Sequence, residues 1–322
     1  RFDLHRIDGY RNFCNKLWNA ARFVLMNCQA EDLEGEATLS LADRWILSRT
    51  HHLLAASDRA VDTYRFDLYA AAVYDFAWHE YCDWYLELTK PLLWNEDTPA
   101  AVLRGTRRTL LTVLEALLRI AHPMIPFITE AIWRETAPLL DIRGATIMLQ
   151  PFPEADDFSA DPEADAAIAW LQGMVLGVRN IRGEANLKPK QMVNVLLQGG
   201  NDRDRTLAAA TEDLFRRLAG VEAVSWLAPE DTPPANALSL VGELKIMIPL
   251  AGLIDLEGER ARLQKEFTRK QQELQRLTAK LDNPEFVDKA PEAVVARERQ
   301  KQRDAEAALS TLQTQLATIS NA

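Results

Sequence analysis

Two heptad series from Leu253 onward place the strongest constraint on how this chain folds. Heptad positions, most of them apolar, alternate in steps of four and three along 256–281, and again along 295–319. This spacing is typical of helices that pack along a continuous seam. The connector Asp282–Glu292 is long enough to reverse the chain, so a hairpin explains both series more economically than one rod. We therefore predict an antiparallel coiled-coil hairpin in residues 252–322.

The register of this hairpin follows from the numbering, because antiparallel layers need a nearly constant sum of residue numbers. In the middle layers Lys270 falls opposite the small Ala305, which lets the lysine stem cross the seam and its ammonium reach water or a phosphate. The limb 256–281 carries seven Arg or Lys against four Glu, whereas 292–319 is balanced at four against four. We expect the first limb to face an anionic partner, with Arg269 and Lys270 as candidate contacts. The predicted layers pair Leu256 with Ile319, Leu263 with Leu312, Phe267 with Leu309, Lys270 with Ala305, Leu274 with Gln302, Leu277 with Glu298 and Leu281 with Val295.

The stretch Gly9–Asn27 is an uninterrupted helical pattern with two useful faces. One face is a predicted buried stripe, which comprises Phe13, Leu17, Ala20, Val24 and Leu25. A neighbouring face carries two amides, an ammonium and a ring, which are Asn12, Lys16, Asn19 and Phe23. Amides and an ammonium can meet base edges and phosphates, while a ring accepts a stacked base. This row is a candidate RNA-binding face; from spacing alone, an ordinary solvated polar face stays open as the alternative.

Further helical patterns complete a predicted bundle in residues 1–144. The densely aromatic third helix is expected to end at Lys90-Pro91, and its rings to fill the core. Thr98 is expected to cap the next helix with Pro99 at its first position. The predicted helices after the first run from Leu41 toward Val61, from Asp67 to Thr89, from Thr98 to His122, and through a short segment that ends at Leu140.

Residues 145–251 predict a small α+β domain with a mostly antiparallel sheet. A helix from Pro162 to about Ala185 ends in a basic cluster, and a second helix is expected at 204–218. The cluster could contact phosphates or only complement the dipole of its helix end, and its members are Arg179, Arg182, Lys188 and Lys190. The expected strands are a possible short one at 146–150, followed by 193–197, 223–226, 237–241 and 244–249.

Composition limits the classes of function. The chain of 322 residues is 48% hydrophobic and 26% charged, with a net charge of −10, which argues against a general polyanion binder. Residues 1–27 nevertheless hold five Arg or Lys against two Asp. Three widely spaced cysteines support neither a disulfide framework nor a metal site. No apolar run suggests a membrane span and no signal sequence opens the chain, so we expect a cytosolic protein. Because the sequence begins at Arg1, we also expect it to be cut from a longer polypeptide.

The string Tyr10–Phe23 resembles the first helix of the anticodon-binding domain in the bacterial valyl-tRNA synthetase family. Residues Ala71–Lys90 and His122–Trp133 are similar to segments of the class I synthetases for valine, isoleucine and leucine, without choosing among them. The segment Asn283–Val295 resembles the tip of the carboxy-terminal arm of the valyl enzymes. The resemblance covers essentially the whole chain.

This resemblance implies a mainly α, tRNA-binding part of a valine-tRNA ligase that recognises the anticodon and body of tRNA(Val). The implied partners are that tRNA and the catalytic and editing domains upstream; a monomer is expected. The resemblance implies that the parent enzyme uses ATP with magnesium. We expect no cofactor in this segment, because HIGH-like, KMSKS-like and Walker-type strings are absent from its sequence. Two alternatives stay open. One is the equivalent region of an isoleucyl-type enzyme, disfavoured by the missing cysteine-rich zinc module, and the other is a non-enzymatic coiled-coil scaffold.

Overall fold

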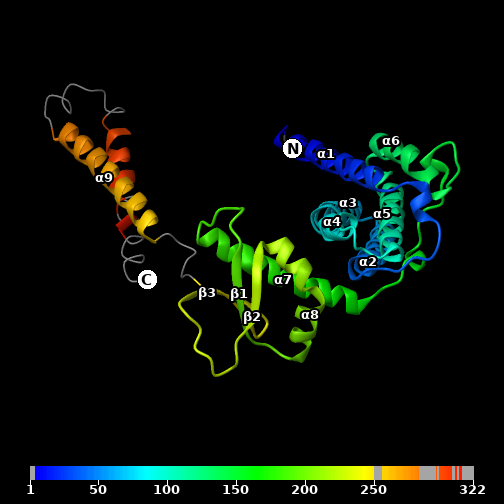
Figure 1. Ribbon diagram of the computed structural model, residues 1–322. Coiled ribbons are helices and arrows are strands. Elements are labelled where there is room, and N and C mark those ends of the chain that lie inside the picture. Colours follow the sequence, from blue (N-terminus) through cyan, green and yellow to red (C-terminus); the bar gives the residue numbers. More distant parts are fainter. Residues whose placement is uncertain are drawn as a thin grey trace. The chain divides into compact units, whose positions relative to one another are not determined.

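The computed structural model describes residues 4–249, 256–282, 295, 297–306, 309 and 312–313, apart from the side chains of 4–6, 256–263 and 266. The chain divides into two compact units (Figure 1), which are Arg1–Leu176 with Asn201–Ala219, and Gly177–Gly200 with Gly220–Ala322. The first unit is helical, and the second holds a four-stranded sheet and, further along the chain, the helical residues described within 256–281 and 295–313. The predicted mainly α fold is confirmed, while the three-part division at residues 144 and 251 stays a prediction.

The first unit is a bundle of long helices joined by short 3-10 turns. Helix α5 lies nearly buried along the length of its second half, and the stripe expected on α1 is buried except for Leu25, which lies at its edge. Helix α7 belongs to this unit only from Pro162 to Leu176, whereas α8 belongs to it over its full length. The elements are α1 (Leu4–Asn27), η1 (Ala30–Leu33), α2 (Leu41–Asp62), α3 (Phe66–Asp75), η2 (Phe76–Tyr85), α4 (Leu86–Leu93), α5 (Ala100–Ala121), α6 (Pro126–Thr136), η3 (Ala137–Leu140), η4 (Ile147–Leu149), η5 (Ala155–Asp157), α7 (Pro162–Glu184) and α8 (Asp202–Ala219).

A buried carboxylate joins three helices at the start of α2. Asp43 accepts hydrogen bonds from Tyr85 Oη at 2.7 Å, from Thr106 Oγ1 at 2.8 Å and from Ser40 Oγ at 2.7 Å. Ser40 also caps α2, because its hydroxyl accepts a hydrogen bond from the amide of Asp43 at 3.2 Å. Burial raises the pKa of Asp43 above its usual range, and these hydrogen bonds partly oppose that rise. Three hydroxyl groups thus replace the water that this carboxylate loses.

The aromatic third helix departs from the predicted α-helix. It runs as α3, then as the π-helical segment η2, then as α4. Phe76, Tyr81 and Tyr85 are buried at spacings of five and four, which suit the wider π turn. A regular α-helix would instead direct Glu80 and Asp83 towards the core from Phe76. The helix also continues through Pro91, which the sequence analysis placed at its end, and finishes at Leu93.

Two smaller expectations about the bundle are wrong. Thr98 does not cap α5, because its hydroxyl donates to the carbonyl of Leu92 at 2.8 Å, and Pro99 stands at the N-cap position instead. The short strand expected at 146–150 is a 3-10 turn. Glu130 organises that turn, since its carboxylate accepts from the Thr146 hydroxyl at 2.8 Å and from the amide of Ile147 at 3.0 Å.

The sheet of the second unit is mixed, with strand order β2-β1-β4-β3. The pairs β1–β4 and β3–β4 are antiparallel, whereas β1 and β2 are parallel. The expected mostly antiparallel sheet is confirmed. The β1–β2 pair is the exception, because α8 connects these strands and a helical crossover returns the chain in the same direction. The strands are β1 (Val193–Gly199), β2 (Val221–Trp226), β3 (Asn236–Val241) and β4 (Leu244–Pro249).

The arm contains helix α9 (Leu256–Leu281) and, beyond it, the described helical residues 295, 297–306, 309 and 312–313. Gln302 donates to the Thr278 hydroxyl at 3.2 Å, and Glu298 pairs with Lys280 at 3.3 Å. The partner number falls as the α9 number rises, so the two limbs run antiparallel. Every described layer position is buried or half-buried, as predicted. The layer of Leu256 with Ile319, and the side chain of Leu263, lie outside the described residues.

Candidate nucleic-acid interface

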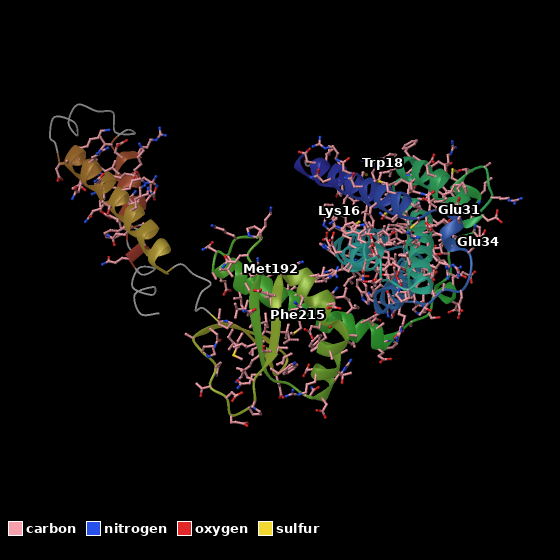
Figure 2. All side chains as sticks on the ribbon, viewed as in Figure 1. Lys16, Trp18, Glu31, Glu34, Met192 and Phe215 are labelled. Atoms are coloured by element: carbon pink, nitrogen blue, oxygen red, sulfur yellow. The ribbon has the colours of Figure 1, made fainter. Side chains whose placement is uncertain are left out.

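The four side chains of the row predicted on α1 lie on one side of that helix, but they are not equally available to a ligand. Asn12 and Asn19 are exposed, whereas Lys16 and Phe23 are half-buried. Figure 2 shows Lys16 and Trp18 on opposite sides of α1. Both amides are available to base edges, while the ammonium and the ring already have neighbours within the bundle.

Lys16 lies over an aromatic stack at the junction of α1, α3 and η2. Its ammonium donates to the carboxylate of Asp83 and stands 3.9 Å from the ring centroid of Trp78. Trp78 stacks on Tyr74 at 5.5 Å between centroids, and Tyr74 stacks on Phe13 at 5.1 Å. An ammonium above a ring face is attracted by the ring quadrupole. Lys16 is therefore held in place before any ligand arrives.

Phe23 belongs to a second aromatic group at the end of α4. Its ring meets that of Trp94 edge to face, with 6.5 Å between centroids. The ammonium of Lys90 lies 5.9 Å from both centroids and donates to the carboxylate of Glu87. Trp94 is 65% exposed, which is unusual for so large an apolar ring. A ring pair beside a cation is an arrangement that can stack an unpaired base next to its phosphate.

The sequence analysis missed the aromatic neighbours of the row. It assigned the rings of the third helix to the core, which is correct for Tyr69, Tyr81 and Tyr85. Tyr74 and Trp78 instead lie at the surface end of the stack. Trp94 follows Pro91, where the sequence predicts the end of the helix, so the predicted helix does not include it. Continuing helical spacing past the proline would have placed Trp94 one turn after Lys90.

The basic end of α7 divides into one half-buried arginine, which binds backbone carbonyls, and a group of exposed side chains. The guanidinium of Arg182 donates to four backbone carbonyls, those of Gln191 at 2.7 Å, Lys188 at 3.1 Å, Pro189 at 3.0 Å and Gly220 at 3.3 Å. Arg182 thus holds the loop that carries Lys188 and Lys190. Those two lysines and Arg179 are exposed. The lysines are presented to solvent, whereas the donors of Arg182 are occupied by the fold.

The two cationic candidates on the arm also differ. Lys270 is half-buried, and its ammonium donates to Glu273 at 2.8 Å, which lowers the pKa of that carboxyl group. Arg269 is exposed and borders a hollow of about 410 Å³, which is also lined by Gln272, Glu273, Arg276 and Leu277. Two guanidinium groups beside one hollow suit a phosphate better than Lys270 does. Arg276 is thus a candidate phosphate contact in addition to the predicted Arg269 and Lys270.

Among the residues that the structure describes, no three His, Cys, Asp or Glu side chains gather in a way that would hold a metal ion. None of the helices described is both long enough and apolar enough to cross a bilayer.

Two protein-family models match this chain. Residues 43–197 match the anticodon-binding domain of tRNA ligase, and residues 255–320 match the valyl-tRNA synthetase tRNA-binding arm. A helical bundle followed by a helical hairpin, with these two matches, defines the tRNA-binding region of an aminoacyl-tRNA synthetase. Since the arm model is that of the valyl enzymes, the chain belongs to the valyl-tRNA synthetases, and its partner is tRNA. Helix α1 precedes the first matched range, whereas η2 and α4 lie inside it.

Proposed function

We propose that this chain selects tRNA(Val) by two separate contacts, one to the anticodon and one to the tRNA body. The match of residues 255–320 to the valyl arm carries the proposal, because the anticodon-binding model alone describes tRNA ligases in general. Asn12, Lys16, Asn19 and Phe23 meet the anticodon, with Trp94 and Lys90 as additional neighbours of Phe23. Lys188, Lys190 and the first limb of the arm meet phosphates of the tRNA body.

In the parent enzyme these contacts hold the tRNA so that its 3′ end reaches an active site upstream, where valine is attached with ATP and magnesium. Binding energy from remote contacts then improves both substrate choice and orientation. This region itself takes no part in adenylate formation. The absence of recognisable ATP-binding motifs from the sequence supports that assignment.

The test is a binding titration of the chain with tRNAs specific for valine, isoleucine and leucine at one fixed salt concentration. We expect the valine tRNA to bind tightest, and valine-dependent exchange of pyrophosphate into ATP to stay at background. Equal affinity for the three tRNAs would remove valine specificity from this region. Tighter binding of the isoleucine tRNA would favour the isoleucyl-type alternative, and no tRNA binding at all would favour the scaffold.

A further inference from the structure

A groove lies in the bundle where α2 ends, α3 begins and the chain turns after α5. Its volume is about 740 Å³, within the range of roughly 300 to 1,000 Å³ that is usual for binding sites. None of the residues of the candidate nucleic-acid interface lines it. The lining residues are Asp58, Val61, Asp62, Phe66, Tyr69, Pro123, Met124 and Phe152.

The floor of this groove, which we call the α2–α3 groove, is apolar and open to solvent. Val61, Phe66, Met124 and Phe152 are each between 39% and 57% exposed. They come from four different segments, so their gathering is a product of the fold and not of one helix pattern. Contiguous exposed apolar surface of this kind marks interaction sites in folded proteins.

The rim of the groove carries two carboxylates in an unfavourable place. Asp58 and Asp62 lie four residues apart in the last turns of α2, where the helix dipole is negative and like charges repel. Among the described residues neither carboxylate forms an ion pair, and the nearby Arg65 pairs with Asp67 at 2.7 Å. A cation bound at this rim would relieve both the dipole and the mutual repulsion.

We propose that the α2–α3 groove binds a basic amphipathic segment of another polypeptide. The apolar side chains of this segment fill the floor over Phe66 and Phe152, and its Lys or Arg side chains pair with Asp58 and Asp62. RNA is disfavoured here, because its phosphates would meet two carboxylates at the end of a helix dipole. The bundle thus separates two functions, with tRNA at the α1 row and a protein partner at this groove.

The test uses the whole chain and a fluorescent Leu/Lys amphipathic helical peptide, with a Leu/Glu peptide of equal length as the counterpart. We expect the Leu/Lys peptide alone to bind, and the double variant Asp58→Asn/Asp62→Asn to weaken it by about tenfold or more. The same double variant should melt at a higher temperature than the wild type, because it removes the unfavourable charges. Weaker binding by a more stable protein excludes misfolding as the cause.

The matched control is Glu31→Gln on η1 with Glu34→Gln just after it (Figure 2), which removes the same charge from two exposed side chains outside the groove. It should leave peptide affinity unchanged within about twofold. An equal loss in this control, or equal binding of the Leu/Glu peptide, would overturn the proposal. So would a Phe66→Ser variant that keeps full affinity. If Phe66→Ser instead converts a dimer of the free chain to a monomer, the groove is a self-interface and the proposed basic partner is wrong.

Discussion

At the residue scale, the α1 row shows that a side chain suited to RNA can already be engaged in the free protein. The ammonium of Lys16 forms an ion pair with Asp83 and also lies over the ring of Trp78. Binding a phosphate must therefore compete with an internal ion pair. The competition is modest, because the side chain of Asp83 is partly exposed and exposed pairs contribute roughly 0.2 to 1 kcal/mol.

The first prediction separates the charge of Lys16 from its restraint. Lys16→Ala should weaken binding of an anticodon stem-loop and flatten its salt dependence by about one phosphate contact. Asp83→Asn should tighten binding by about 1.4- to 5-fold, the range that corresponds to release of an exposed ion pair. Fluorescence anisotropy over a series of salt concentrations measures both effects.

The control for this prediction is Asp75→Asn, which removes one negative charge from an exposed position on α3. If Asp75→Asn tightens binding as much as Asp83→Asn does, the effect is general electrostatics and Lys16 is not restrained in the way we describe. If Lys16→Ala leaves both affinity and salt dependence unchanged, the α1 row is the wrong face.

Residue spacing predicted the helix and the stripe on α1 because both depend on local periodicity. The ion pair of Lys16 with Asp83 was not predictable in this way, since it joins residues 67 positions apart. It also depends on the π turns of η2, which decide that Asp83 faces outward. A single sequence carries no simple signal for such turns.

At the element scale, the loop after α7 depends on one guanidinium. Arg182 donates to carbonyls on both sides of Lys190 in the chain and to Gly220, so it fixes where the exposed lysines stand. A planar guanidinium can address several carbonyls at once, and an ammonium cannot. The sequence analysis recognised the cationic cluster, but composition could not tell Arg182 from the exposed members.

The second prediction follows from this division of roles. Arg182→Lys keeps the charge but loses several of the four hydrogen bonds, so unfolding should become easier by about 1 to 3 kcal/mol. Amide hydrogen exchange in residues 186–192 should accelerate, while the salt slope of tRNA binding stays unchanged. Lys188→Gln, the matched control, should lower the salt slope and leave exchange unaffected. A fall in the slope with Arg182→Gln and no change in loop exchange would show that Arg182 itself meets phosphate.

The sheet also shows which features of an element can be predicted from the sequence and which cannot. Alternating apolar residues predicted all four strands within a few positions, because strand formation depends on a local pattern. The direction of β2 relative to β1 depends on how α8 returns the chain, which is a property of the connection and not of either strand. The sheet is therefore mostly antiparallel, as predicted, and the β1–β2 pair is the one parallel pair among the described strands.

At the scale of the whole molecule, the proposed function depends on two tRNA contacts that can be removed independently. The arm hairpin was predicted in detail, because heptad spacing encodes both the seam and the register. The contacts of Gln302 with Thr278 and of Glu298 with Lys280 confirm its antiparallel direction in the described part. Glu298 lies between Lys280 and Lys301, and these ammonium groups lower its pKa. The ion pairs of this layer should thus persist at neutral pH and weaken as the pH falls through that lowered pKa.

The last prediction concerns this arm. Helix α9 has 26 residues, which at 1.5 Å each make a rod of roughly 40 Å, long enough to reach the tRNA body. Deletion of residues 256–319 should weaken binding of full-length tRNA and leave binding of an isolated anticodon stem-loop unchanged.

The alternative to a tRNA-binding arm is a rod that joins two chains. Thr278→Cys with Gln302→Cys distinguishes the two, because their hydroxyl and amide groups are 3.2 Å apart within one chain. Oxidation should form the crosslink within one chain. The arm would instead be a dimerisation element if only crosslinked dimers formed and if the deletion left the binding of both the stem-loop and full-length tRNA unchanged.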